Sequence, residues 1–215
     1  MVEFVKDGAT GMEKVLLREP GGATAQIHLY GGHVTSWRNE RGEELLFLSS
    51  KAIFKPPKAI RGDTKPFTFT FALHTYLSVS DISEVRIEGL ETLDFLDNLQ
   101  EKERFTEQGD AITFDSEVDR IYLGTPTKIA IIDHDKKRTF VLKKEGLPDA
   151  VVWNPWEKKA KAMADFGDDE YKHMLCVEAA AVEKAITLKP GEEWKARQEI
   201  SAVPSSYFSG QLDPC

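Results

Sequence analysis

The feature of this chain that most constrains its fold is a series of short apolar segments with a period of two residues. Glycine, proline and aspartate interrupt these segments at short intervals; residues 23–30 (ATAQIHLY), for example, alternate until Gly31 and Gly32. Successive side chains of a strand point to opposite faces, so this alternation is typical of strands with one buried face. Further strands are expected at residues 33–39, 45–48, 67–79, 85–88, 129–132, 139–143, 151–153, 174–182 and 193–203.

Helical periodicity is weak by comparison, and residues 156–166 (WEKKAKAMADF) are the one candidate, which could equally be a charged loop. Many strands at close spacing with hardly a helix predict an all-β fold, an antiparallel sandwich or barrel. The sequence contains no repeat, low-complexity tract or linker, so residues 1–215 are expected to form a single domain.

The charge balance limits the classes of partner. The 215 residues carry a formal net charge of −8. This argues against nucleic acid or an anionic membrane surface, which favour basic stripes, but a small anionic substrate needs only a few local cations. No stretch approaches the ~20 apolar residues of a membrane span, and the first residues show no signal peptide. The two cysteines, Cys176 and Cys215, make no disulfide framework, so a cytoplasmic protein is expected.

The segment 66–79 (PFTFTFALHTYLSV) contains the first candidate for chemistry. Its odd positions are mainly aromatic and aliphatic, whereas its even positions include threonines, His74 and Tyr76. In a strand, His74 would therefore point away from the aromatic face. It is either a histidine on a solvated sheet face or part of a polar floor that binds a sugar, and spacing alone leaves both open.

The segment 174–182 (MLCVEAAAV) contains the second candidate, because Glu178 is its only charged residue. At a strand edge Glu178 would lie in water. If it is buried, desolvation raises its pKa above the ordinary ~4.3, and partial burial brings it toward neutrality, where a general base is most effective. The alanines 179–181 would leave room for a ligand beside it.

Other chemistries lack their motifs. The sequence has no phosphate-binding glycine loop, HExxH, CxxC or GxSxG pattern. His28 and His33 lie five residues apart across a Gly-Gly turn, a poor spacing for a metal, and Cys176 has no evident activating base in the sequence. We therefore expect neither a metal nor a cofactor. A glycosidase needs two carboxylates at a set distance, and sequence spacing does not report that distance.

Several ordered motifs resemble one family. They are YGGHVTSW (30–37), KAIRG (58–62), FALHTYLSV (71–79), DNLQ (97–100), EVDRIY (117–122), VVWNPWEKKAKAMADFGDDEY (151–171) and MLCVEAAAV (174–182). Together they resemble the aldose 1-epimerase superfamily, in particular its glucose-6-phosphate 1-epimerase branch. The resemblance implies a galactose-mutarotase-like antiparallel β-supersandwich that needs no metal and interconverts the α and β anomers of hexose 6-phosphates.

The resemblance also implies roles for four residues. Glu178 matches the family's base, which takes the proton from the anomeric hydroxyl, and His74 matches the acid, which protonates the ring oxygen. Asp119 matches an aspartate that binds sugar hydroxyls; otherwise it is a surface carboxylate paired with Arg120. Arg61 matches an arginine that binds the phosphate, since a guanidinium fork fits phosphate oxygens; otherwise it is a solvated surface charge.

The chain departs from the family after Gly62. There the family has a loop rich in proline and phenylalanine, a Gln-His-Gly motif with a second phosphate arginine, and several strands, whereas here Asp63 follows at once and opens the histidine strand. We interpret this as a missing segment between Gly62 and Asp63 that leaves the sandwich incomplete. The chain is then a sugar-phosphate mutarotase, acting as a monomer, or a non-catalytic carbohydrate-binding or regulatory variant, or an unstable product.

Overall fold

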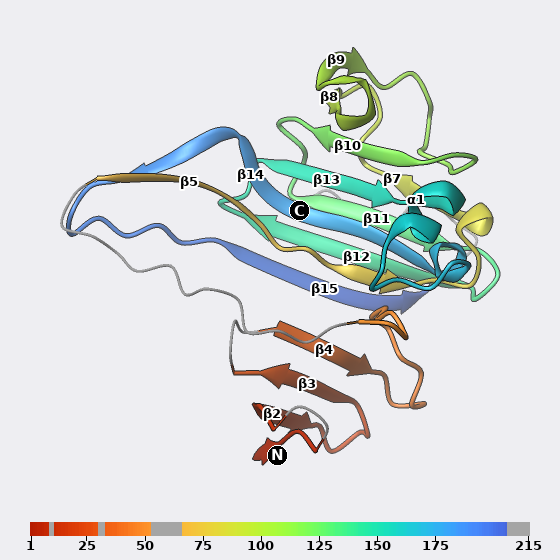
Figure 1. Cartoon of the computed structure of the whole chain (residues 1–215), viewed down its shortest axis with the longest axis vertical. Coiled ribbons are helices and arrows are strands. Elements are labelled where there is room, and N and C mark those ends of the chain that lie inside the picture. Colours follow the sequence, from red (N-terminus) through yellow and green to blue (C-terminus); the bar gives the residue numbers. More distant parts are fainter. Residues whose placement is uncertain (9–10, 30–32, 53–65, 206–215) are drawn as a thin grey trace.

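Three antiparallel sheets make up the computed structural model, which describes residues 1–8, 11–29, 33–52 and 66–205 (Figure 1). The N-terminal sheet has four strands in chain order and lies at one end of the molecule (Figure 1). Its strands are β1 (Val2–Lys6), β2 (Glu13–Arg18), β3 (Thr24–His28) and β4 (His33–Arg38).

The other two sheets form the body of the molecule. One has the order β5-β14-β13-β10-β8-β9, with β6 also paired to β14, and the other has the order β15-β12-β11-β7. Their strands are β5 (Phe67–Ala72), β6 (Tyr76–Ser78), β7 (Val85–Glu88), β8 (Asp94–Asp97), β9 (Glu103–Thr106), β10 (Val118–Tyr122), β11 (Lys128–Asp133), β12 (Arg138–Glu145), β13 (Asp149–Asn154), β14 (Met174–Leu188) and β15 (Arg197–Pro204). The all-β sandwich expected from the sequence is thus the observed fold class.

Helices are few and short in the described residues. The α-helix α1 (Trp156–Ala162) occupies the first part of the expected helical segment, and three 3-10 turns, η2 (Ile82–Glu84), η3 (Asn98–Gln100) and η4 (Glu170–His173), connect strands. Asn154 holds the start of α1, because its side-chain oxygen accepts from the backbone N–H of Trp156. No described helix combines the length and apolar character that crossing a membrane requires.

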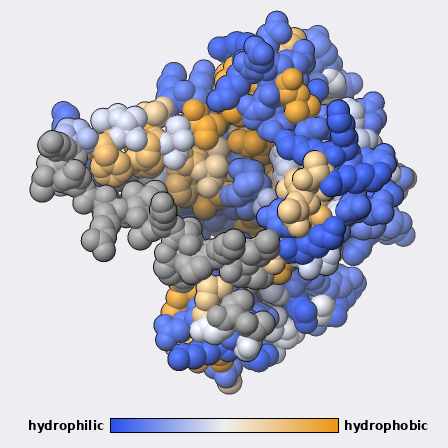
Figure 2. Space-filling view, in the orientation of Figure 1, coloured by the Kyte–Doolittle hydropathy of each residue, from blue (hydrophilic) through white to orange (hydrophobic). Residues whose placement is uncertain are grey.

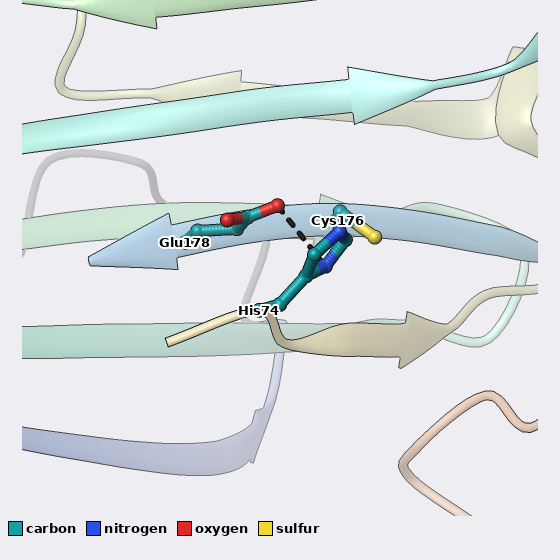
Figure 3. Close-up of side chains that lie close together, drawn as sticks. All are labelled: His74, Cys176 and Glu178. Carbon is teal, nitrogen blue, oxygen red and sulfur yellow. Dashed lines mark ion pairs between the residues drawn. The ribbon is translucent and has the colours of Figure 1, made fainter. Parts of the chain in front are cut away.

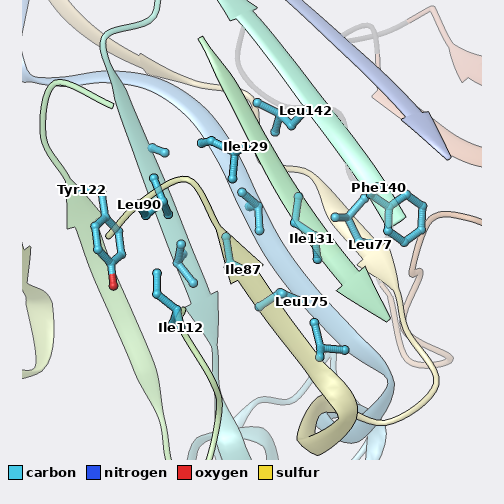
Figure 4. Close-up of a cluster of buried hydrophobic side chains, with 14 of the residues drawn as sticks. Leu77, Ile87, Leu90, Ile112, Tyr122, Ile129, Ile131, Phe140, Leu142 and Leu175 are labelled. Atoms are coloured by element: carbon cyan, nitrogen blue, oxygen red, sulfur yellow. The ribbon is translucent and has the colours of Figure 1, made fainter. Parts of the chain in front are cut away.

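The main hydrophobic core lies between the two sheets of the body (Figure 4). Leu175, Val177 and Ala179 of β14 belong to it, together with Ile131 of β11 and Phe140 of β12. Burial of each large apolar side chain contributes about 1.5–3 kcal/mol. Because strand side chains alternate, the residues between them on β14 face the other side of the sheet.

The expected strand 67–79 is interrupted in the structure. Residues 67–72 form β5 and residues 76–78 form β6, and both pair with β14. The expected strand at 45–48 is also absent. Leu46 forms only an isolated bridge with Leu77 of β6. The more polar strands β1, β2, β8, β9 and β10 were not expected from the sequence.

The strand β5 and the second half of β14 project from the body as an arm (Figure 1). Apolar residues gather on this arm in the space-filling view (Figure 2), and Phe67 is 39% exposed. The rings of Phe69 and Phe71 pack edge-on against Trp194. Within the described residues β5 is the last strand of its sheet, so one side of it is an unpaired edge.

Candidate active site

The pairing of β14 with β5 and β6 places residue 74 opposite residue 178. Ala72 pairs with Ala180 before the interruption and Tyr76 pairs with Cys176 after it, so the register continues through residues 73–75 without a shift. Directly opposed residues of an antiparallel pair lie on the same face with Cβ atoms about 4.5–5.5 Å apart. The order of the chain therefore brings His74 and Glu178 together.

The two side chains are in direct contact. Nδ1 of His74 lies 3.0 Å from Oε1 of Glu178 (Figure 3). The imidazole is half exposed, at 52%, whereas the carboxylate is only 7% exposed. The alternative that Glu178 lies in water at a strand edge is wrong, and the pair presents a solvent-facing imidazole over a buried carboxyl group.

Hydrogen bonds fix the short interruption that carries His74. The backbone N–H of Leu73 donates to the carbonyl oxygen of Ala179 at 3.0 Å. The hydroxyl of Thr75 donates to the carbonyl oxygen of Leu73, and Gln198 of β15 donates from Nε2 to that hydroxyl, each at 3.1 Å. These contacts hold the backbone on both sides of His74.

Two aromatic rings orient the imidazole. The His74 ring stacks on Tyr76, with centroids 4.6 Å apart and an interplanar angle of 4°. Trp153 meets the same ring edge-on at 5.9 Å and 90°. Because aromatic pairs of these geometries are attractive, they restrict the rotamer of His74.

A row of side chains crosses four neighbouring strands beside the pair. Tyr76 of β6 is opposite Cys176 of β14, Cys176 is opposite Trp153 of β13, and Trp153 is opposite Asp119 of β10. Since opposed residues share a face, all four side chains lie on the face of the sheet that carries Glu178. The regular sheet thus brings Asp119, from a distant part of the sequence, to the same surface as His74.

Asp119 is held by two polar neighbours. Asn98 of η3 donates from Nδ2 to Oδ1 of Asp119 at 2.7 Å, and Nζ of Lys159 on α1 lies 3.7 Å from Oδ2. The alternative that Asp119 is a surface carboxylate paired with Arg120 is wrong, because Arg120 forms its ion pair with Glu107.

The environment shifts the pKa values of the two groups in opposite directions. Burial, and secondarily the negative charge of Asp119, raise the pKa of Glu178 to about 7. Burial lowers the pKa of His74 below 6.5, although Asp119 opposes this change. The pKa of the Glu178 carboxyl group thus lies near neutrality, where transfer of a proton to or from it costs little.

Cys176 lies next to the pair on the same strand face (Figure 3). One potential ligand atom from each of His74, Cys176 and Glu178 lies within 4.8 Å of the other two, the one such group found among the described residues. Burial raises the pKa of the Cys176 thiol well above its ordinary value, so the free protein carries a thiol here and not a reactive thiolate.

Arg61 lies outside the described residues, and its expected phosphate contact stays a prediction. Trp153, Lys159 and Asn98 were not expected from the sequence to be part of the site. Trp153 and Lys159 belong to the motif 151–171, and Asn98 belongs to the motif DNLQ. These motifs indicated the family, but they did not indicate what each of the three residues does in the site.

Comparison with protein families identifies the relationship. The family described as "Aldose 1-epimerase" matches residues 13–65 and 62–201. The chain belongs to the aldose 1-epimerase family. The two matched segments meet at residues 62–65, where the sequence departs from the expected pattern.

Two relatives of this chain carry the same name. A "Putative glucose-6-phosphate 1-epimerase" of Cenchrus ciliaris is 53% identical over 300 aligned positions, which span 99% of this chain and 91% of that protein. A protein of the same name from Haemophilus influenzae is 30% identical over 176 positions, spanning 77% of this chain and 63% of the relative.

Solved structures confirm the fold. A "putative mutarotase (YeaD)" from Salmonella typhimurium superposes with a TM-score of 0.79 at 20% identity, covering 94% of this chain and 97% of that chain. The structure titled HI1317 gives a TM-score of 0.73 at 19% identity, covering 94% of this chain and all of the other. The galactose-mutarotase-like sandwich expected from the sequence is therefore confirmed.

Proposed function

We propose that this protein interconverts the α and β anomers of glucose 6-phosphate and related hexose 6-phosphates by opening and closing the sugar ring. The contact between His74 and Glu178, at 3.0 Å on the open face of the sheet, carries the proposal. The family and the name shared by the relatives support the choice of substrate.

The proposed reaction moves one proton around the ring. Anionic Glu178 takes the proton from the anomeric O1 hydroxyl while protonated His74 gives a proton to the ring oxygen, so that the C1–O5 bond breaks and an aldehyde forms. After rotation about C1–C2, neutral Glu178 returns its proton to O1, and neutral His74 removes the proton from O5 as this oxygen attacks the other face of C1. The pair carries one proton at every stage.

The near-neutral pKa of Glu178 suits such a cycle. The two singly protonated forms, carboxylate with imidazolium and carboxylic acid with imidazole, serve ring opening and ring closure in turn. Because burial raises the pKa of Glu178 to about 7, its carboxyl group can both take up and release a proton near neutral pH.

Asp119 is proposed to accept hydrogen bonds from sugar hydroxyls beside the reacting centre. It lies directly opposite Trp153 in the pairing of β10 with β13, and the Trp153 ring also contacts His74. Asn98 and Lys159 orient its carboxylate. Arg61 is proposed to bind the phosphate.

We also propose that a family segment is missing between Gly62 and Asp63. The family matches this chain in two pieces that meet at residues 62–65, and the alignment with the Cenchrus protein extends over 300 positions although this chain has 215 residues. If the missing segment supplies further phosphate contacts, this chain binds its substrate more weakly than its relatives while it retains the acid–base pair.

The anomerisation rate tests the proposed function. The purified protein is mixed with freshly dissolved α-glucose 6-phosphate, and the anomeric proton signals are followed by NMR. We expect the approach to equilibrium to be faster than in buffer and to accelerate in proportion to protein concentration. A rate equal to the spontaneous one, with ligand still shifting protein signals, would instead support a non-catalytic binding protein.

The chain is further proposed to act as a cytoplasmic monomer. Both members of the pair come from the same chain, so the chemistry needs no second copy. The buried Cys176 is a free thiol, which suits a reducing compartment.

A further inference from the structure

The face of β14 that carries the acid–base pair also carries a sulfur atom that the proposed reaction does not use. Cys176 and Glu178 are two residues apart on one strand, and His74 lies opposite Glu178 (Figure 3). One nitrogen, one sulfur and one oxygen thus converge within 4.8 Å of one another. We propose that His74, Cys176 and Glu178 bind a zinc ion, which inhibits the enzyme by occupying the acid–base pair; the inhibition rests on the proposed function.

The donor set favours a thiophilic divalent cation. Zinc binds thiolate sulfur at ≈ 2.3 Å, imidazole nitrogen at ≈ 2.0–2.1 Å and carboxylate oxygen at ≈ 2.0–2.2 Å, commonly with three protein ligands and one open position. Magnesium and calcium prefer oxygen ligands, so one oxygen, one sulfur and one nitrogen discriminate against them.

The positions of the three residues allow such a site to close. In a tetrahedral zinc site neighbouring ligand atoms are on the order of 3.5 Å apart, so the group has to contract by about 1 Å from its widest separation. Cys176 and Glu178 are fixed on β14 and buried. His74 lies outside the regular strands and is half exposed, so solvent can reach the ion, and its ring closes the site by shifting against Tyr76 and Trp153.

The surrounding charge favours a cation. Asp119 lies close enough to act electrostatically on His74, Cys176 and Glu178. Lys159 approaches Asp119 at 3.7 Å but makes its closer contact, 3.1 Å, with Glu117. When zinc binds, the Cys176 thiol releases its proton to the solvent and its sulfur donates an electron pair to the ion. No group changes its oxidation state.

Cadmium binding tests the site without reference to catalysis. Cys215, the second cysteine of the chain, is first replaced in a Cys215→Ser protein, so that Cys176 is the one thiol left. Under anaerobic conditions, Cd²⁺ is added and the ultraviolet charge-transfer band of a cadmium–thiolate bond is recorded. We expect a band that saturates at one equivalent and that falls when zinc is added. A flat titration overturns the site whether or not the protein anomerises sugars.

Inhibition is then measured on two variants of Cys176, since neither removes a group from the proposed reaction. In Cys176→Ser and Cys176→Ala we expect the anomerisation rate to be kept and the half-inhibitory zinc concentration to rise by at least about tenfold, because even the loss of an outer partner of a metal ligand costs ~10–100-fold in affinity. Two variants are used because Cys176 is fully buried and one of them can fold poorly. Unchanged zinc inhibition in either folded variant overturns the proposal, and Cys215→Ser is the matched control.

Discussion

Nδ1 of His74 and Oε1 of Glu178 are 3.0 Å apart because the two residues occupy opposed positions of one antiparallel strand pair. Their contact therefore depends on strand register, and a shift of one residue would turn either side chain to the opposite face. The same register places Tyr76 beside Cys176 and supports the imidazole with a stacked ring. The geometry of the pair is thus a consequence of the sheet.

Replacing either member of the pair is expected to abolish most of the rate enhancement. We predict that Glu178→Gln and His74→Gln each lower kcat by roughly 10²–10⁴-fold, the typical contribution of one general acid or base. The anomeric NMR assay measures this loss.

Two control variants test whether the loss of activity is specific to the pair. Glu183→Gln changes an exposed glutamate on the same strand, and His134→Gln changes an exposed histidine in a turn. Both are expected to keep the rate of the original protein. Equal losses in the control and the pair variants would mean that the substitutions act through folding.

The rate is expected to have a bell-shaped dependence on pH with an optimum near neutrality, in metal-free buffer. Below the optimum both groups are protonated and the base is lost; above it both are deprotonated and the acid is lost. The raised pKa of Glu178, about 7, places the optimum near neutrality. The apparent values belong to the coupled pair. A profile that is flat from pH 5 to pH 9 would contradict this account.

Removing the charge of Asp119 is expected to move both limbs of the pH profile to lower pH. Asp119 raises the pKa of Glu178 and also raises that of His74, so Asp119→Asn lowers both. The substitution should also raise KM, since a sugar contact is lost. Glu117→Gln removes a charge from the same Lys159 neighbourhood and is expected to leave the profile in place. An unshifted profile in Asp119→Asn would show that its charge does not reach the pair.

Glu178 is expected to reduce the stability of the folded protein above neutral pH. Its pKa is about 7 in the folded state and near 4.5 when unfolded, so the folded state holds more protons between these values. The free energy of unfolding therefore falls as pH rises through this window. Glu178→Gln should be more stable than the original protein at pH 8, by on the order of 2–3 kcal/mol, with a smaller gain at pH 5.

Urea unfolding at the two pH values measures this difference. Glu183→Gln, whose side chain is exposed, is expected to unfold like the original protein at both. If Glu178→Gln is equally stable or less stable at pH 8, other interactions of the ionised Glu178 carboxylate offset the free-energy cost of its desolvation.

The proposed missing segment predicts weak selectivity for the phosphate. We expect the KM for glucose 6-phosphate to be higher for this chain than for the Cenchrus relative by roughly 10-fold or more, since each lost charge-assisted contact is worth ~1.5–3 kcal/mol. Parallel assays of both proteins with glucose 6-phosphate and with glucose measure the difference. Equal KM values for the phosphate would mean that the segment contributes no phosphate contacts.

The sequence predicted the more apolar strands and missed the more polar ones. Alternation in residues 67–79 identified the face that carries His74, and the single charge in residues 174–182 identified Glu178. By contrast, β1 and β9 are largely exposed on both sides, so burial leaves no periodic signal in them. The segment 45–48 is apolar and lies beside β6, although it makes only one isolated bridge, between Leu46 and Leu77.

Without the family resemblance, a member of the site followed from the sequence only where a residue was unusual in its own segment. Glu178 was the one charge in residues 174–182, and the structure buries it. Trp153, Cys176 and Asp119 become neighbours through the pairing of β10, β13 and β14, which is set by tertiary structure. Lys159 reaches Asp119 from a helix, and no local pattern encodes that contact.

The most direct test of the account is the exchange of magnetisation between the two anomeric proton signals of glucose 6-phosphate at equilibrium. The original protein, Glu178→Gln and Glu183→Gln are compared at equal concentration in metal-free buffer at neutral pH. We predict rapid exchange with the original protein and with Glu183→Gln, and exchange at the spontaneous rate with Glu178→Gln. Undiminished exchange in a folded Glu178→Gln protein would contradict the central role of the pair.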